Sequence, residues 1–491
     1  MSLPGELRAF WRAEARDHRI ALVVIVIAGV ILRLLTLSQP MRYDESVTYL
    51  EFVRHPLAQA LSRYDYPNNH LFHTLLAKAS VAAFGNQPWA LRLPAFVAGV
   101  CIVPLSYAVA RVLYGGRPAV LAAGLVASSG VLALYSTNAR GYSILILLFL
   151  ILVLVAARII AAATRTLWLT FAVVAALGVW TIPVMLYPLG AVSLWLGLSL
   201  LTSGRRRELP WLAGALALGA ALTVLAYGPV FSHAGLAAVT RNGFVASTEW
   251  TKFLGDLAIA AWDTLMSWGL GLPPLVSAML LAAAVIALAR HERVSRFAVG
   301  LPLAAFVWDA WLLMVTHRAP FPRIWLWCVP VALAVAGAGI VDVVDRSRRL
   351  ALLKPRIPML AALASLVFAA SVALSGAVLL TRDTGTFVDA EATATQLSHL
   401  LRPGDRVLAV IPTNGPLAYY LDRLGVDSSY MKTDESLAKR LIVVVNEGEE
   451  ETVQDVLRYP DASDSNKFAA SLIAQRPLSK VYLLERRDAP H

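Results

Sequence analysis

Residues Ile20–Ser46 read IALVVIVIAGVILRLLTLSQPMRYDES and place two adjacent carboxylates, Asp44 and Glu45, shortly after a long apolar run. An apolar stretch of about 18 or more residues is long enough to cross the hydrocarbon core of a membrane. Four arginines precede this run, at positions Arg8, Arg12, Arg16 and Arg19. Positive charge before a first span favours a cytoplasmic N-terminus, so we predict a retained span and not a cleavable signal.

The composition extends this reading to most of the chain. Its 491 residues are 58% hydrophobic and only 15% charged, against about 25% charged in soluble proteins. We predict an α-helical polytopic membrane protein with about eleven transmembrane helices. The net charge of +11 does not indicate nucleic acid, because arginine clusters are typical of cytoplasmic loops. Cys101 and Cys328 both lie in apolar runs, which gives no reason to expect disulfides or a cysteine metal site.

The expected spans lie near residues 20–38, 89–112, 118–135, 142–162, 167–182, 184–203, 210–231, 272–290, 298–316, 324–343 and 358–380. Arginines concentrate in alternate loops, and the positive-inside rule places those loops in the cytoplasm. The remaining loops, including a long first loop at 39–88, then lie outside. This loop is expected to carry interfacial helices, and residues 253–274 read as another helix along the interface.

Three regions follow from this pattern: a cytoplasmic N-terminus at 1–19, a transmembrane domain at 20–380, and a C-terminal tail at 381–491. The tail is polar and contains the short apolar runs RVLAVIP, RLIVVVNE and KVYLLER, separated by helical-looking stretches. Such alternation predicts a small extracytoplasmic α/β domain.

Asp44 and Glu45 are candidates for general acid–base chemistry. A carboxylate beside a membrane can deprotonate a hydroxyl that then attacks a sugar carbon. The alternative is a solvated acidic pair, or a pair that caps the helix predicted at ESVTYLEFVRH.

The same loop continues with RYDYPNNHLFHTLL, which contains Asn68, Asn69, His70 and His73. Histidines three residues apart share one helix face. They could bind a sugar or, together with Glu45, a divalent metal ion, although this spacing is not a strong metal signature. The alternative is structural, with an asparagine capping the helix and the histidines bonding to nearby loops.

Arginines at the outer span ends run against the topology bias. Arg92 lies in WALRLPAF, Arg140 precedes Tyr142 in YSTNARGYS, and Arg323 follows His317 in THRAPFPRIW. A guanidinium fork suits a phosphate. For any one arginine, snorkelling to lipid headgroups is the simpler explanation, but the three together favour a lipid-phosphate site.

The order of these motifs resembles the GT-C membrane glycosyltransferases, in particular the bacterial branch similar to dolichyl-phosphate-mannose protein mannosyltransferases and to the lipid A aminoarabinose transferase. The matching elements are RYDES, PNNHLFHTLLAKASVAAFG, LRLP and YSTNARGY, over roughly residues 20–345. The chain departs from this pattern at WTIPVMLYP, which lacks a histidine, and at Ile324, which follows Arg323.

The resemblance implies an inverting glycosyltransferase of the cell inner or plasma membrane that uses a polyprenyl-phosphate sugar donor and a protein, lipid or glycan acceptor. It implies that Asp44 is the base, that Glu45 supports it, and that outer-face basic residues hold the donor phosphate, with Arg140 and Arg323 matching those positions best. Arg92 is a further candidate for the phosphate because of its place at a span end. The remaining candidates for substrate binding are Tyr43, Asn68, Asn69, His70, His73, Tyr142 and His317. The alternative functions are a non-enzymatic binder or flippase of lipid-linked sugars, or another transporter; no cofactor is certain, and a divalent metal stays open.

Overall fold

The computed structural model describes residues 11–64, 68–240, 247–431, 440–458 and 468–486. Arg8, part of the predicted basic N-terminus, and residues 65–67 of the first loop lie outside these ranges. The chain divides into two compact units. The first comprises Met1–Leu37, Leu61–Leu76 and Arg92–Val378, and the second comprises Ser38–Ala60, Ala77–Leu91 and Leu379–His491. The second unit therefore groups the tail with two pieces of the first loop.

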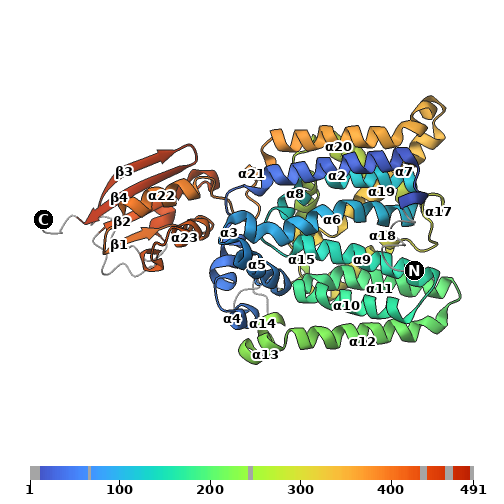
Figure 1. The fold of residues 1–491 in the computed structure, drawn as a ribbon, viewed down its shortest axis with the longest axis horizontal. Helices are drawn as coiled ribbons and strands as arrows, with labels where there is room; N and C mark the ends of the chain where they lie inside the picture. Colours follow the sequence, from blue (N-terminus) through green and yellow to red (C-terminus); the bar gives the residue numbers. More distant parts are fainter. Residues whose placement is uncertain (1–10, 65–67, 241–246, 432–439, 459–467, 487–491) are drawn as a thin grey trace. The chain divides into compact units, whose positions relative to one another are not determined.

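The predicted fold class is confirmed, because apolar helices make up most of the described chain (Figure 1). Within the described residues, seven helical segments are long and apolar enough to span a membrane, and a bent pair of helices brings the count to eight. The seven segments contain α2 (Arg16–Leu37), α6 (Pro88–Tyr114), α9 (Tyr142–Ala161), α11 (Leu186–Thr202), α12 (Leu209–Ala226), α19 (Cys328–Arg346) and α20 (Ile357–Leu374). The bent pair is α7 (Gly116–Ala127) and α8 (Gly130–Ser136).

Three further predicted spans coincide with shorter apolar helices: α10 (Arg165–Thr181), α16 (Pro274–Ala289) and α18 (Leu301–Thr316). Two stretches predicted as interfacial are also helical, α5 (Leu71–Phe84) and α15 (Trp250–Trp268). The remaining helices of this part are short: α13 (Gly228–Ala234), α14 (Ala237–Thr240), α17 (His291–Val294), η2 (Pro183–Met185), η3 (Arg206–Glu208), η4 (Pro322–Trp325) and η5 (Arg348–Arg356).

Small residues bring the helices of the first unit close together. A Cβ added at Gly124 of α7 would lie 3.0 Å from the carbonyl oxygen of Ala361 in α20, and one at Gly337 of α19 would lie 3.0 Å from that of Pro118 in α7. Membrane helices associate through such backbone approaches, because lipid supplies no hydrophobic force between them. α2 also packs against α7 and α20 (Figure 1).

The second unit begins with the acidic stretch of the first loop. Tyr43–Val47 form α3, Thr48–Val53 continue as the π-helix η1, and Leu57–Ser62 form α4. The short helix α21 (Ala377–Leu380) leads into the tail. The tail itself contributes α22 (Ala390–Leu400), α23 (Asn414–Arg423), α24 (Val453–Leu457), η6 (Ser428–Met431) and η7 (Glu447–Glu449).

The tail also holds a mixed four-stranded sheet in the order β1-β2-β4-β3. β1 (Asp405–Leu408) runs parallel to β2 (Arg440–Asn446), while β4 (Ser479–Arg486) runs antiparallel to β2 and to β3 (Phe468–Arg476). Strands β1, β2 and β4 fall in the three apolar runs noted in the sequence, which confirms the predicted α/β character. β3 was not expected, because three of its nine residues are alanine, which is depleted in strands, and Ile473 is its single β-branched residue.

Candidate functional site

In the first unit, polar side chains gather where α8 ends, α9 begins and residues 68–70 lead into α5. Arg140 is 3% exposed, and its Nη1 donates to the carbonyl oxygen of Asn68 at 2.8 Å. The backbone N–H of Gly141 donates to Nδ1 of His70 at 2.8 Å. The rings of His70 and Tyr142 meet edge to face at 5.2 Å. Two segments separated by some seventy residues thus form one polar cluster.

Asn69 and Thr74 stabilise the entry to α5. The amide Nδ2 of Asn69 donates to the carbonyl oxygen of Arg63 at 2.8 Å, and its Oδ1 accepts from the Thr74 hydroxyl at 2.8 Å. Asn69 is 1% exposed. These bonds fix the backbone that carries His70 and His73.

Both histidines are fully buried and held neutral. Burial, followed by the Arg140 guanidinium, lowers the pKa of His73 to about 3. Burial also lowers the pKa of His70 far below its usual value, with further contributions from Arg140, His73 and Arg323. His70 accepts a hydrogen bond at Nδ1, so its neutral ring carries the proton at Nε2. Neither ring nitrogen of His73 has a hydrogen-bond partner among the described residues.

Arg323 lies within electrostatic range of this cluster, since it acts on the pKa of His70. It belongs to η4, and its Cζ is 4.9 Å from the centre of the Phe321 ring. The structure therefore brings together six predicted residues in the first unit: Asn68, Asn69, His70, His73, Arg140 and Tyr142, with Arg323 close enough to influence them electrostatically.

Two other predicted residues of this unit have different surroundings. The Nη1 of Arg92 donates to the carbonyl oxygen of Leu37, the last residue of α2, at 2.7 Å. A cation at a helix C-terminus is stabilising, so this bond supports a capping role. His317 ends α18 in the left-handed conformation and packs on Trp250 of α15, with ring centres 4.1 Å apart.

The second unit carries the predicted acid pair on α3. Glu45 is fully buried, and its Oε1 accepts from the backbone N–H of Arg42 at 2.9 Å. This bond is one half of a capping box, so Glu45 stabilises the start of the helix that carries Asp44. Asp44 is partly exposed, and its backbone N–H donates to the carbonyl oxygen of Thr384 at 3.4 Å. Tyr43 precedes it as the first residue of the helix.

Two buried ionisable residues in apolar runs were missed in the sequence. Arg33 of α2 is fully buried, and its Nε donates to the Ser136 hydroxyl at 3.2 Å. Its Nη1 donates to the carbonyl oxygen of Ala127 at 3.1 Å. Asp309 of α18 is 7% exposed, and its Oδ1 has no hydrogen-bond partner within the described chain. A charged residue inside an apolar run was the signal that could have identified both.

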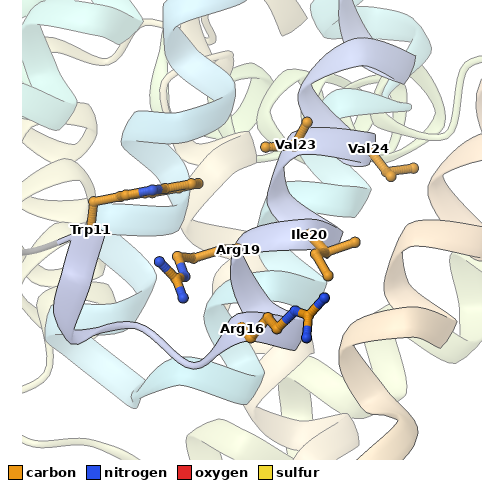
Figure 2. A pocket seen from close by; sticks show the side chains of 6 residues that line it. All are labelled: Trp11, Arg16, Arg19, Ile20, Val23 and Val24. Carbon is orange, nitrogen blue, oxygen red and sulfur yellow. The ribbon is translucent and has the colours of Figure 1, made fainter.

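Figure 2 shows a hollow at the N-terminal end of α2, lined by Trp11, Arg16, Arg19, Ile20, Val23 and Val24. Arg19 extends toward the Trp11 indole, while Arg16 extends beside Ile20 (Figure 2). The lining contains no carboxylate, so this hollow offers no general base. Apolar side chains flanked by arginines and a tryptophan are typical of a surface in contact with lipid.

The chemistry of the donor set gives no support to a metal centre. In the ranges that the structure describes, no three His, Cys, Asp or Glu side chains are grouped so that they could hold a metal ion. The Nδ1 of His70 is already occupied by the Gly141 N–H.

The fold is similar to those of two solved proteins, ArnT and an oligosaccharyltransferase. ArnT from Cupriavidus metallidurans in its apo state superposes with a TM-score of 0.59 at 13% identity, covering 94% of this chain and 97% of that protein. ArnT bound to undecaprenyl phosphate gives a TM-score of 0.59 at 15% identity, with the same coverage of 94% and 97%. The apo oligosaccharyltransferase of Archaeoglobus fulgidus gives 0.52 at 13% identity, covering 89% of this chain and 70% of that one.

At the level of sequence, residues 68–227 match the family described as dolichyl-phosphate-mannose-protein mannosyltransferase. This segment contains most of the polar cluster. The resemblance noted from the motifs is thereby confirmed. A comparison with curated proteins gives no match.

Proposed function

We propose that this multi-pass membrane protein is a glycosyltransferase that moves a sugar from a polyprenyl-phosphate donor to an acceptor hydroxyl on the extracytoplasmic face. The observation that carries the proposal is the polar cluster around Arg140 and His70, set within a GT-C fold. The ArnT structure with bound undecaprenyl phosphate supports a donor of this chemical class.

The reaction is a single displacement at the anomeric carbon. The acceptor oxygen attacks this carbon and loses its proton to the Asp44 carboxylate, while the bond from the carbon to the phosphate oxygen breaks. Polyprenyl phosphate leaves with the bonding electron pair, and the anomeric configuration inverts. A carboxylate positioned at the acceptor hydroxyl contributes about 10²–10⁴-fold to such a rate.

The polar cluster suits the phosphate. Arg140 is held by its bond to Asn68, so its charge is fixed in place before the donor arrives. A preorganised cation in a site shielded from water stabilises the charge that develops on the leaving group. The neutral rings of His70 and His73 add no positive charge and can exchange hydrogen bonds with a sugar. Arg323 supplies a second positive charge, and Arg92, whose Nη1 bonds to the Leu37 carbonyl oxygen, stays a candidate for the phosphate.

The variant Asp44→Asn tests whether Asp44 is the base. The variant Glu45→Gln, at the adjacent residue, serves as the comparison. Each chain would be purified in detergent and supplied with a polyprenyl-phosphate sugar. Asp44→Asn removes the proton acceptor with little change of shape, so turnover should fall by about 10²–10⁴-fold while donor binding persists. Glu45→Gln should mainly lower stability, because Glu45 holds the Arg42 N–H.

Arg140→Met completes this experiment on the donor side. It removes the charge and the bond to Asn68, so donor affinity should fall by about tenfold or more. Turnover of Asp44→Asn near the wild-type rate would show that another group is the base. Donor binding without any transfer by the wild-type protein would favour a binder or flippase.

A further inference from the structure

The tail and the acidic helix belong to one compact unit although more than 330 positions separate them. α3 has only five residues. An isolated helix this short is not stable in water, so its conformation must come from tertiary contacts. The source of those contacts determines what orients Asp44.

Arg42, the residue before α3, makes the largest number of these tertiary contacts. Its side chain is buried, and its Nη1 donates to the carbonyl oxygens of Thr381 at 2.8 Å and Asp383 at 2.9 Å. Its Nη2 donates to the carbonyl oxygen of Leu379 at 3.4 Å, and Nε and Nη2 both donate to Oε1 of Gln39 at 3.2 and 3.1 Å. One guanidinium thus ties three carbonyl groups at the start of the tail to the segment that carries Asp44.

The backbone makes the same connection. Arg42 forms an isolated β-bridge with Thr386, and the N–H of Tyr43 donates to the carbonyl oxygen of Gly385 at 3.1 Å. Thr386 in turn bonds to the end of β2, since its carbonyl oxygen accepts from Nδ2 of Asn446 at 2.8 Å. A continuous path of hydrogen bonds therefore runs from the sheet to α3.

Helix α23 of the tail also contacts α3 and the residues that follow it. The rings of Tyr49 and Tyr419 meet edge to face at 5.2 Å, and Arg54 pairs with Asp422 at 3.0 Å. Gly415, in the first turn of α23, lies so close to Tyr43 that an added Cβ would be 2.8 Å from its Cδ2. The first helical residue before Asp44 is thereby in direct contact with the tail.

We propose that Arg42 is a positioning residue and that the tail domain sets the orientation of Asp44. The tail acts as a scaffold: it holds α3 through the Arg42 guanidinium and through the contact between Tyr43 and α23. This inference rests on the proposed role of Asp44 as base. It gives the tail a part in the transfer reaction without any substrate contact of its own.

The test compares Arg42→Met and Arg42→Lys with Arg382→Met, a control in the same segment whose exposed guanidinium pairs with Glu450. Displacing a catalytic group by about 1 Å can cost about 10²-fold in rate. Arg42→Met should therefore lower kcat by about 10²-fold per folded molecule, with the KM for the donor changed by less than about threefold. Arg42→Lys should recover part of the loss, because lysine keeps the charge but not the fork. Arg382→Met should leave kcat near wild type, since exposed ion pairs contribute little.

Gly415→Ala gives a second, independent measurement. Alanine favours a helix over glycine by about 1 kcal/mol, so this change does not weaken α23 itself. Its methyl group should press on Tyr43 and lower kcat by about fivefold or more. Gly255→Ala in α15 is the matched control, because its added Cβ meets no atom within 4 Å.

The inference is overturned if kcat per folded molecule in both Arg42→Met and Gly415→Ala stays within about twofold of wild type while Asp44→Asn is inactive. An active Asp44→Asn would instead overturn the proposed base. The two failures are therefore distinct.

Discussion

His73 is unusual among the buried residues because its ring lies in the first turn of α5 with both nitrogens unpaired within the described chain. A buried polar group without a partner costs about 1–3 kcal/mol. A ring that forms hydrogen bonds only with a bound substrate would account for this cost in a cluster that also contains Arg140. Sites of this kind exchange stability for function.

His73→Leu should therefore stabilise the protein and weaken donor use. The folded pKa of His73 lies at about 3, below its usual value of 6.5, so the folded state binds fewer protons than the unfolded state between these limits. The free energy of unfolding should fall as the pH drops below about 6.5, by roughly 2 kcal/mol at pH 5 from this residue. Thermal unfolding in detergent from pH 5 to 8 would show a shallower slope in His73→Leu. An unchanged slope would contradict the assignment.

The roles of single residues were harder to predict from the sequence than the positions of helices and strands. Asn68, His70 and Arg140 were recognisable because their polar types interrupt apolar patterns at the ends of spans. Arg92 was recognisable for the same reason, and its bond to the Leu37 carbonyl oxygen could not be predicted from the sequence. A sequence pattern shows that a charge must have a partner in the membrane, but the packing of the helices decides which partner it finds.

At the scale of elements, the break between α7 and α8 is maintained by a side chain from another helix. The two helices meet at 60°. Arg33 donates to Ala127 at the end of α7 and to Ser136 at the end of α8. The guanidinium satisfies a carbonyl group that the break leaves without a helical donor.

Arg33→Met should lower the unfolding temperature, because the Ala127 carbonyl would remain buried without this donor. The expected loss is about 1–3 kcal/mol. Ser136→Ala removes only one of these bonds and should cost about 1 kcal/mol. Thermal unfolding of both variants in detergent measures the difference, and an Arg33→Met protein as stable as wild type would refute this account.

Helices and strands were predicted with more success than their exact limits. Long apolar runs are unambiguous, so each predicted span coincides with a helix or with the bent pair. The bend itself was not foreseen, because the ASSG sequence at residues 127–130 contains no proline. Strand β3 was missed because its pairing with β4, and not its own composition, makes it a strand.

At the scale of the whole molecule, the predicted sidedness can be measured directly. Cys101 and Cys328 are free and would be replaced by serine. Single cysteines would then be placed at exposed positions: Gln454→Cys in the tail, and Ser203→Cys at the end of a predicted span that leads into a predicted cytoplasmic loop. A membrane-impermeant maleimide should label Gln454→Cys in intact cells and Ser203→Cys only after permeabilisation. The reverse pattern would invert the proposed topology.

The grouping of the tail with parts of the first loop could not be read from the sequence. It depends on contacts such as Arg54 with Asp422 and Tyr419 with Asn86, which join positions more than 330 residues apart. Composition predicted the α/β character of the tail. Only the three-dimensional structure assigns the acidic helix to that same unit.

The 60° angle between α7 and α8 also sets how far the chain advances along the direction of α7. α8 has seven residues, so it is about 10 Å long. At this inclination it advances only about 5 Å in the direction of α7, about half of what a straight continuation would cover. Arg140, which follows α8 in the chain, therefore lies closer to the end of α7, measured along α7, than it would after an unbroken helix.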